Sequence, residues 1–505
     1  MKRRCFAALL CLLLLAGTLP LPARSEGNPA ENLSDIQIVT ASSGFQAVEP
    51  LFDGILTKGD PATGPSSLTL EHEGGIGSLY FLFGSESGSY TVTNNATGTV
   101  INCGESGFLH DFVDLTALFG AAPASVTVTF PKDGVEIYEL YVYAPGEVPA
   151  SVQKWQVPAD GKTDLVLFST HCDDEQLFFA GVLPYYAAEL KYQVQVVYMT
   201  DHREDDTRRV HEMLNGLWAV GVTAYPVIGG FPDFYILNNL EGAYLGFEAR
   251  GCSRDMLLKY VVENLRRFKP MVAVGHDING EYGHGMHMVY TDLLMEAVTI
   301  ANDPARYPES AEKYGPWDTP KTYLHLYEEN PIVMDWDVPL KSFDGMTAFQ
   351  VTQKLGYPCH ESQYEIFSWY HYAYETAREI PRYNPCYYGL YRSTVGEDIE
   401  KNDFFENVIT HAEAARLAAK EEARLAEEAQ LAAEEEARLA EEARIAQEQR
   451  LAEEKRLAEE ARLAEEVRLA EAARQNHLKG VCMAVCAAFV FVILGAVFIL
   501  RRRKK

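Results

Sequence analysis

The sequence predicts an α/β protein whose main domain has a mainly parallel, Rossmann-like sheet. A β-sandwich domain precedes it, and a long single helix and a transmembrane helix follow. Three observations predict this arrangement: period-two hydrophobic alternation over 26–148, repeated strand–loop–helix units over 160–408, and a run of helix-forming residues over 411–476. With 505 residues and 47% hydrophobic content, the chain can build several buried cores, which excludes global disorder. Its net charge of −28 argues against nucleic acid as a partner, because a phosphate binder needs a positive face.

Residues 1–25 have the pattern of a secretory signal peptide. Three basic residues at positions 2–4 precede an apolar run over 5–16, and Ala23-Arg24-Ser25 provides a small-x-small cleavage site. The alternative is an uncleaved membrane anchor. The apolar run is shorter than the roughly 20 residues that a span requires, so we expect cleavage after Ser25.

The next segment, 26–148, is expected to form a β-sandwich. Short runs alternate between apolar and polar residues and are separated by Gly, Asn and Ser clusters, which is typical of antiparallel strands. The clearest runs are 67–71, 79–83, 90–93, 125–130 and 137–143. The turn at 48–54 and the closing strand at 137–143 resemble those of discoidin-like, galactose-binding domains. The resemblance implies sugar binding, and an inert spacer domain remains the alternative.

The segment 160–408 alternates between strand and helix patterns, which indicates an α/β domain with a mainly parallel sheet. Ligands bind at the carboxyl ends of the strands in such sheets. Two histidine-rich loops, 170–175 and 276–287, each follow a predicted strand directly. The predicted strands are 164–169, 194–199 and 271–274, and the predicted helices are 208–219, 254–268 and 286–301.

These two loops supply a candidate metal site. His171, Asp174 and His287 offer two imidazoles and a carboxylate, and three such ligands leave a tetrahedral Zn²⁺ one open position for water. Zinc lowers the pKa of a bound water to about 7. Asp173 could take the proton of that water as a general base. The alternative for a lone His-x-Asp-Asp loop is a capping or surface turn, and the second loop favours the metal site.

The loop around residue 284 supplies further candidates. Tyr282 and His284 could donate hydrogen bonds to an oxyanion that develops during the reaction. His276 and Asp277 form a rival pair after the same strand, and His276 could replace His287 as a ligand. The spacing around His284 favours His287.

The two loops resemble the signature motifs of the LmbE-like (PIG-L) zinc-dependent de-N-acetylases. Residues 170–175, Thr-His-Cys-Asp-Asp-Glu, are similar to the family's Ala-His-Pro-Asp-Asp-Glu. Residues 281–287, Glu-Tyr-Gly-His-Gly-Met-His, are similar to its Tyr-Gly-His-x-x-His loop. The helix 209–212 that leads toward Gly221-Val222, and the segment 360–363, His-Glu-Ser-Gln, resemble supporting motifs. The resemblance covers about 160–408.

The resemblance implies zinc as the cofactor and assigns the site residues the roles given above. It also implies that Arg209 and Asp233 contact sugar hydroxyls. The alternative for Arg209 is a helix-surface ion pair with Asp205 or Glu212. Cys172 replaces the signature's proline, and we expect it to be a bystander because the three neighbouring ligands already complete a site. Sequence separation alone favours a disulfide between Cys359 and Cys386.

The expected activity is removal of acetyl from N-acetylated amino sugars of the N-acetylglucosamine type by a zinc-dependent hydrolase. The net charge of −31 over 26–410 favours a neutral sugar over a polyanionic substrate. Two alternatives remain open. One is a non-catalytic surface glycan-binding protein, and the other is a zinc amidase that acts on peptide amides.

The charged segment 411–476 is expected to be a solvated single helix of about 100 Å. It consists almost entirely of Ala, Glu, Arg and Leu, and leucine or isoleucine recurs every six residues from 439 to 469. Six residues at about 100° each place successive leucines on three different faces, whereas a coiled coil needs one stripe with a period of 3.5. We therefore expect a monomeric stalk, with a docking helix for a partner as the alternative.

Residues 481–500 carry no charge and match the thickness of a bilayer core, which predicts a transmembrane helix. The basic residues 501–505 follow and should remain in the cytoplasm. The alternative, a buried helix in a soluble domain, fits poorly beside five adjacent charges. The sequence thus predicts a single-pass protein at the cell surface, with its catalytic domain outside the cell.

Overall fold

The computed structural model describes residues 28–59, 61–203, 207–363 and 373–503. The predicted signal peptide, 1–25, and the last two residues of the basic tail lie outside the described residues. The chain divides into two compact units, Met1–Ala414 and Ala415–Lys505.

The N-terminal part of the first unit consists of two antiparallel sheets. Strands β2 and β7 bury every second residue, and in β7 the residues Val126, Val128 and Phe130 are inaccessible to solvent. Phe81 of one sheet packs on Phe130 of the other, with ring centroids 6.0 Å apart. All five predicted strands in this part are confirmed. The five-stranded sheet has the order β1 (Val39–Ser43), β2 (Ser66–Glu71), β7 (Ser125–Phe130), β4 (Tyr90–Asn94), β5 (Val100–Cys103), and the three-stranded sheet has the order β6 (His110–Asp114), β3 (Ser78–Phe83), β8 (Ile137–Tyr143).

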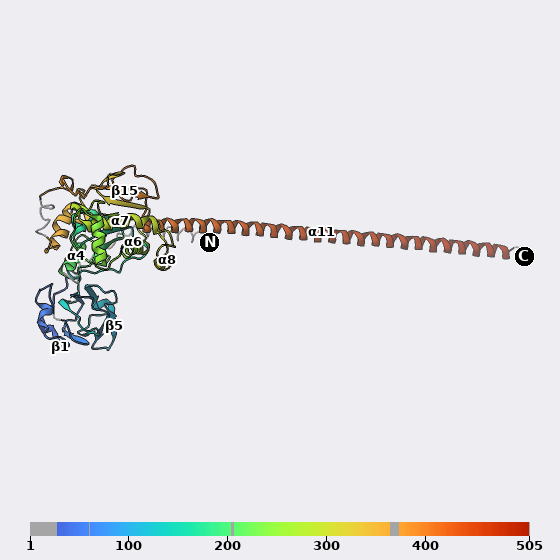
Figure 1. Cartoon of the computed structure of the whole chain (residues 1–505). Coiled ribbons are helices and arrows are strands. Elements are labelled where there is room, and N and C mark those ends of the chain that lie inside the picture. Colours follow the sequence, from blue (N-terminus) through green and yellow to red (C-terminus); the bar gives the residue numbers. More distant parts are fainter. Residues whose placement is uncertain (1–27, 60, 204–206, 364–372, 504–505) are drawn as a thin grey trace. The chain divides into compact units, whose positions relative to one another are not determined.

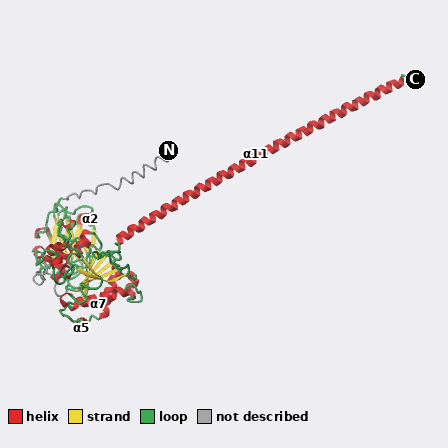
Figure 2. Cartoon of the chain, turned by 90° about the horizontal axis from the view of Figure 1, so that it is seen from above, coloured by secondary structure: helices red, strands yellow, loops and turns green. Residues whose placement is uncertain are grey.

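The rest of the first unit is built around a seven-stranded sheet, which confirms the predicted mixed α/β class (Figure 2). The first five strands in spatial order pair in parallel, and β15 is antiparallel to both of its neighbours. Its order is β11 (Val227–Phe231), β10 (Val194–Thr200), β9 (Leu165–Ser169), β12 (Val272–Gly275), β13 (Lys321–His325), β15 (Tyr387–Ser393), β14 (Pro331–Val333).

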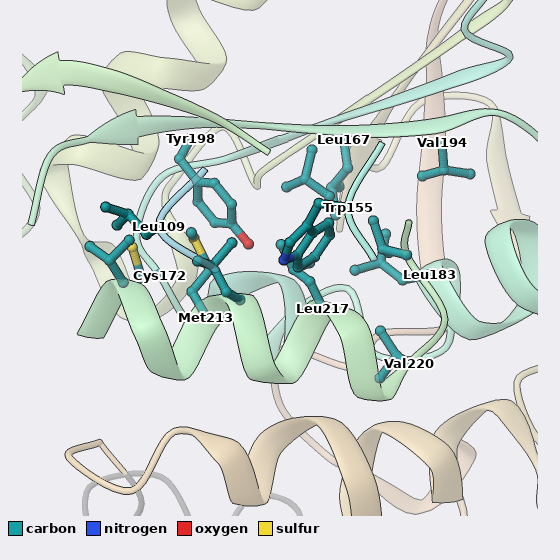
Figure 3. Packing of buried hydrophobic residues seen from close by; sticks show 14 of the residues in the cluster. Leu109, Trp155, Leu167, Cys172, Leu183, Val194, Tyr198, Met213, Leu217 and Val220 are labelled. Atoms are coloured by element: carbon teal, nitrogen blue, oxygen red, sulfur yellow. The ribbon is translucent and has the colours of Figure 1, made fainter. Parts of the chain in front are cut away.

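Helices cover both faces of this sheet, because the central strands are apolar on both sides. On one face, Leu167 of β9 and Tyr198 of β10 lie over Met213 and Leu217 of α4 (Figure 3). On the other face, Val166 and the remaining alternate residues of β9 and β10 pack against α5, α6 and α7. The helices are α2 (Leu115–Phe119), α3 (Asp174–Leu177), α4 (Thr207–Ala219), α5 (Leu240–Ala249), α6 (Arg254–Phe268), α7 (Gly285–Ile300), α8 (Pro308–Tyr314) and α9 (Ala348–Val351).

Short 3₁₀ and π segments complete the first unit. They are η2 (Ile36–Ile38), η3 (Glu49–Phe52), η4 (Pro184–Glu189), η5 (Glu281–Gly283), η6 (Lys341–Phe343), η7 (Thr352–Gly356), η8 (Tyr357–Cys359) and η9 (Ala377–Glu379). Of these, η5 belongs to the second histidine-rich loop and helps to shape the candidate site.

One continuous helix, α11 (His411–Arg502), extends through the second unit (Figure 1). No residue of this helix is buried, and its arginines pair along the helix, as Arg438 does with Glu435 and Glu442. Its sequence is long and apolar enough in one part to cross a membrane. The predicted helical stalk is therefore confirmed as a helix, whereas its monomeric state stays a prediction.

Candidate active site

Two loops at the carboxyl end of the parallel strands bring the predicted metal ligands together. The loop after β9 carries His171 and leads to Asp174 in the first turn of α3, and the loop after β12 leads to His287 in the first turn of α7. β9 and β12 are neighbours in the sheet, so their carboxyl ends lie side by side. The second loop turns tightly at Gly280, where φ is +66° and a Cβ would lie 2.3 Å from the carbonyl oxygen of His284.

His171, Asp174 and His287 place three ligand atoms at the corners of a nearly equilateral triangle. Nδ1 of His171 lies 3.0 Å from Oδ2 of Asp174, and Nε2 of His287 lies 3.2 Å from the same oxygen. The two nitrogens are 3.1 Å apart. Bonds of about 2.0–2.1 Å in a tetrahedral zinc site imply about 3.3 Å between ligand atoms. The three residues thus fit a tetrahedral ion that has one further position open.

His276, the rival ligand, is engaged by the protein through both ring nitrogens. Its Nε2 accepts a hydrogen bond from the backbone N–H of Thr170 at 3.0 Å, and its Nδ1 donates to Glu281 at 2.8 Å. Nε2 lies 3.6 Å from Asp174 Oδ2, and the group Asp174, His276 and His287 is compact enough to hold an ion. Because its remaining lone pair already accepts the Thr170 N–H, His276 supports the loop, and His287 is the better ligand.

Glu281, for which the sequence predicts no role, accepts hydrogen bonds from three histidines around the site. It is fully buried, and its Oε2 accepts hydrogen bonds from Nδ1 of His276 and of His287, both at 2.8 Å. Its Oε1 accepts from Nδ1 of His325, also at 2.8 Å. Because Nδ1 of His287 donates its proton to this carboxylate, the lone pair of the ring lies on Nε2, which faces Asp174. The only sequence signal for Glu281 was its place at the start of the second motif.

Comparison with known proteins identifies this part of the chain. Residues 166–298 match the family model described as GlcNAc-PI de-N-acetylase, PIG-L. These residues form a PIG-L family domain. Residues 394–479 match a second model, described as CG45076 coiled-coil.

Curated relatives of the PIG-L domain include bacterial deacetylases. A 1D-myo-inositol 2-acetamido-2-deoxy-alpha-D-glucopyranoside deacetylase of Streptomyces avermitilis is 26% identical over 292 residues, which cover 48% of this chain and 97% of the relative. A similarly named deacetylase 2 of Saccharopolyspora erythraea is 44% identical over 98 residues, covering 19% of this chain and 34% of the relative. Among solved structures, the N,N'-diacetylchitobiose deacetylase of Pyrococcus horikoshii is 17% identical, with 46% of this chain and 83% of that chain covered and a TM-score of 0.34.

The PIG-L domain surrounds its histidines with carboxylates, and these carboxylates set the pKa values. Burial alone would lower the pKa of His171, but Asp233 and Asp174 raise it to about 10. Burial would likewise lower the pKa of His287, and Asp174 and Glu281 raise it to about 9. The same negative field would stabilise a divalent cation between these groups.

His284 is held neutral, in contrast to its two neighbours. Burial, followed by the charges of His171 and His287, lowers its pKa to about 3. Its Nδ1 accepts the backbone N–H of Met286 at 3.3 Å as the N-cap of α7, which leaves the ring proton on Nε2. His284 also belongs, with His171 and His287, to a second group of ligand atoms close enough to hold an ion.

Arg209 of the PIG-L domain faces the site. Its guanidinium lies 3.4 Å from Asp173 Oδ1 and 3.6 Å from Asp233 Oδ2, and 14% of its side chain is exposed. Asp233 Oδ1 lies 3.3 Å from Nε2 of His171, so the pair Arg209 and Asp233 borders the metal triangle. Glu212, one alternative partner, instead lies 3.8 Å from Arg208 and accepts the backbone N–H of Ser362. Asp205, the other alternative, lies outside the described residues.

Tyr282 packs beside the histidines in a left-handed backbone conformation, with φ at 47°. Its ring centroid lies 5.5 Å from that of His284 and 5.6 Å from that of His287. Burial, with the nearby Asp174 and Asp173 carboxylates, raises the pKa of Tyr282 well above its usual value. Its hydroxyl therefore stays protonated and can donate a hydrogen bond.

Among the described residues, no cysteine belongs to the candidate ligand groups. Cys172 is fully buried among apolar side chains, including Met213 of α4, and burial raises its pKa well above the usual value (Figure 3). A protonated, buried thiol is a poor zinc ligand. The predicted disulfide between Cys359 and Cys386 is wrong, since both thiols are free in the structure. Sequence separation carries no information on the distance between two side chains.

Proposed function

We propose that residues 160–408 form a zinc-dependent hydrolase that removes acetyl from N-acetylated amino sugars of the N-acetylglucosamine type. The triangle of His171, Asp174 and His287 carries the proposal, because its spacing suits a tetrahedral ion with one open position. The curated relatives are named as deacetylases of a 2-acetamido-2-deoxy-glucopyranoside, which supports this substrate class.

The ligand triangle would hold the zinc ion, which when bound lowers the pKa of water and polarises the acetyl carbonyl. Asp173 is adjacent to the ligand Asp174 and, by this proposal, accepts the proton of the attacking water. The Nε2–H of His284 and the hydroxyl of Tyr282 donate hydrogen bonds to the acetyl oxygen as its negative charge develops. As the C–N bond breaks, Asp173 returns the proton that it took from the water to the amine nitrogen, giving acetate and a free amino sugar.

Arg209 and Asp233 are proposed to bind hydroxyl groups of the sugar. They border the triangle and offer one donor group and one acceptor group side by side. A sugar hydroxyl can accept a hydrogen bond from the guanidinium while donating one to the carboxylate. The pair would orient the ring so that its acetamido group reaches the open position.

We further propose that this domain acts outside the cell, on the end of a membrane-anchored stalk. The apolar part of α11 is long enough to cross a membrane, and the basic residues 501–505 would remain in the cytoplasm. Protease treatment of intact cells should then remove residues 26–480 and leave a short membrane fragment. An ectodomain that is protected until the membrane is broken would contradict this orientation.

The activity is tested by measuring acetate release from a panel of N-acetylated glycans and, in parallel, from N-acetylated peptides. We expect release from the glycans alone, loss on chelation and recovery on adding Zn²⁺. Release from peptides alone would identify a peptide amidase. A protein that binds glycans but holds no metal and releases no acetate would identify a surface lectin.

A further inference from the structure

The position of Arg209 depends on the helix that carries it more than on its own contacts. Its two ion pairs are long, 3.4 Å to Asp173 Oδ1 and 3.6 Å to Asp233 Oδ2. Its Nε has no hydrogen-bond partner among the residues that the structure describes. Because Arg209 lies in the first turn of α4, the rotation of α4 about its own axis determines whether the guanidinium reaches the candidate site.

Three side chains on one side of α4 are held by residues that precede the PIG-L domain. Thr207, His211 and Asn215 are spaced by four residues, so at about 100° per residue they lie within about 80° of one another. Arg209 lies about 120° to 160° from them around the helix axis. The held side of α4 and the side that carries Arg209 are therefore different, and fixing the first also fixes the second.

Two of these side chains bond directly to strands of the β-sandwich. The hydroxyl of Tyr138 in β8 is hydrogen-bonded to Oγ1 of Thr207 at 3.0 Å. Nε2 of His110 in β6 lies 2.7 Å from Nδ1 of His211, and the two rings stack with centroids 4.9 Å apart. Both histidines are buried. Water cannot replace a hydrogen bond in such a place, so breaking it leaves buried polar atoms without a partner.

The bonds around His110 form a closed chain that begins and ends on α4. Burial lowers the pKa of His110 and of His211, which keeps both rings neutral. Nδ1 of His110 lies 2.7 Å from Oε1 of Gln153, which can only accept, so Nδ1 donates and Nε2 accepts from His211. The amide of Gln153 in turn donates to Oδ1 of Asn215 at 2.6 Å. The chain of bonds joins two successive turns of α4, so a rotation of the helix would stretch it.

We propose that His110 and Tyr138 of the β-sandwich are positioning residues for the candidate active site. They set the rotation of α4 and thereby hold Arg209 beside Asp233, although neither residue touches the substrate. The N-terminal domain then has a role that neither sugar binding nor a spacer describes, because it completes the substrate site of the neighbouring domain. This inference rests on the proposed deacetylase function, in which Arg209 binds a hydroxyl group of the sugar.

The test measures kcat and KM for acetate release by the full chain in detergent, with N-acetylglucosamine or N,N'-diacetylchitobiose, whichever the wild type turns over faster. His110→Phe keeps the stacking on His211 but removes both hydrogen bonds of the ring. It should raise KM about fivefold to tenfold and leave kcat within about twofold. His110→Gln supplies one donor and one acceptor again and should restore KM to within about twofold. Zinc content should be equal in all variants, because α4 carries none of the proposed ligands.

A double-mutant cycle separates the positioning of Arg209 from a general loss of structure. Arg209→Ala removes the group that is positioned, so adding His110→Phe to this variant should change KM no further. Losses that add would show that His110 does not act through Arg209, and they would overturn the proposal. An unchanged KM in His110→Phe would overturn it as well.

Thr69→Val is the matched control. It removes a hydrogen bond of 3.0 Å to Thr127, which joins β2 to β7 within the sandwich and involves no residue of α4. KM should stay at the wild-type value, and a rise equal to that of His110→Phe would overturn the proposal.

If His110→Phe does not fold, Tyr138→Phe decides in its place, because it removes only the hydroxyl that is bonded to Thr207. It should raise KM at least about twofold, and an unchanged KM would overturn the proposal. A wild type that releases acetate while KM is unchanged in these variants would refute this inference alone. A wild type that releases no acetate would refute the proposed function, and this inference with it.

Discussion

The Glu281 carboxylate accepts a hydrogen bond from Nδ1 of His287 at 2.8 Å, so a buried acid fixes the orientation of a candidate metal ligand. Removing that charge should weaken metal binding, because the partner on Nδ1 sets both the tautomer and the basicity of a ligating imidazole. We expect Glu281→Gln to reduce zinc affinity about 10-fold to 100-fold. Competition with a chromophoric chelator measures the affinity directly.

Glu248→Gln, which changes an exposed glutamate of α5 in the same way, is the control for the loss of one negative charge. It should leave the zinc affinity unchanged. Equal affinities in the wild type and the Glu281 variant would show that Glu281 only packs the loop.

In the proposed mechanism, Asp173 takes part in the chemical step but does not bind the metal. It lies beside a ligand residue and contacts Arg209, but it is not part of the ligand triangle. Asp173→Asn should therefore retain zinc while kcat falls about 10²-fold to 10⁴-fold, the usual contribution of a general base. Zinc content and acetate release are measured on the same sample. Undiminished turnover in this variant would refute the assigned role.

Local patterns in the sequence were sufficient to predict most elements of the fold. The helix at 254–268 has the bounds that were predicted, because its apolar residues recur with helical period and Ser253 supplies an N-cap. The two loops could be predicted to meet because both follow strands of one parallel sheet. Each of these predictions depends only on residues that are close together in the sequence.

The remaining features of the site depend on distances between residues that are far apart in the sequence. Whether Arg209 faces the site or solvent depends on how α4 packs on the sheet, and the hydrophobic periodicity of the sequence alone cannot decide this. His325 had no recognisable context in the sequence, and it meets Glu281 only because β13 lies beside β12. The spacing in the sequence favours His287 over His276, and the physical reason is the hydrogen bond from Thr170 to His276, which joins the residues that directly follow two neighbouring strands.

The hexad repeat of α11 makes a prediction about association. Leucines that advance by about 120° per repeat give no continuous stripe, so a fragment of residues 405–478 should be helical and monomeric. Light scattering measures the mass, and circular dichroism measures the helicity. Added 1 M NaCl should lower the helicity, because the ion pairs are exposed to solvent and are screened by salt. A stable dimer or trimer would contradict the single helix, and the match of residues 394–479 to a coiled-coil model makes this the alternative to test.

A buried histidine pair predicts how stability changes with pH. His110 of β6 and His211 of α4 lie 2.7 Å apart between ring nitrogens. Burial lowers the pKa of His211 to about 4, and burial with the charge of His211 lowers that of His110 well below its usual value. An unfolded histidine titrates near pH 6.5, so the unfolded chain binds more protons between about pH 6.5 and 4. Stability should therefore fall as the pH falls through this window, by up to about 3 kcal/mol for His211 alone.

Urea unfolding between pH 7.5 and 4.5, followed by tryptophan fluorescence, measures this dependence. Trp155 and Trp218 lie near the pair. The indole N–H of Trp155 donates a hydrogen bond to the side chain of Gln153, which is also hydrogen-bonded to His110. His211→Gln should flatten the decrease in unfolding free energy below pH 6.5, because one of the two buried imidazoles no longer titrates. His72→Gln, in the loop after β2, should keep the slope of the wild type. If the His211 variant also keeps that slope, the buried pair does not control the acid sensitivity of the protein.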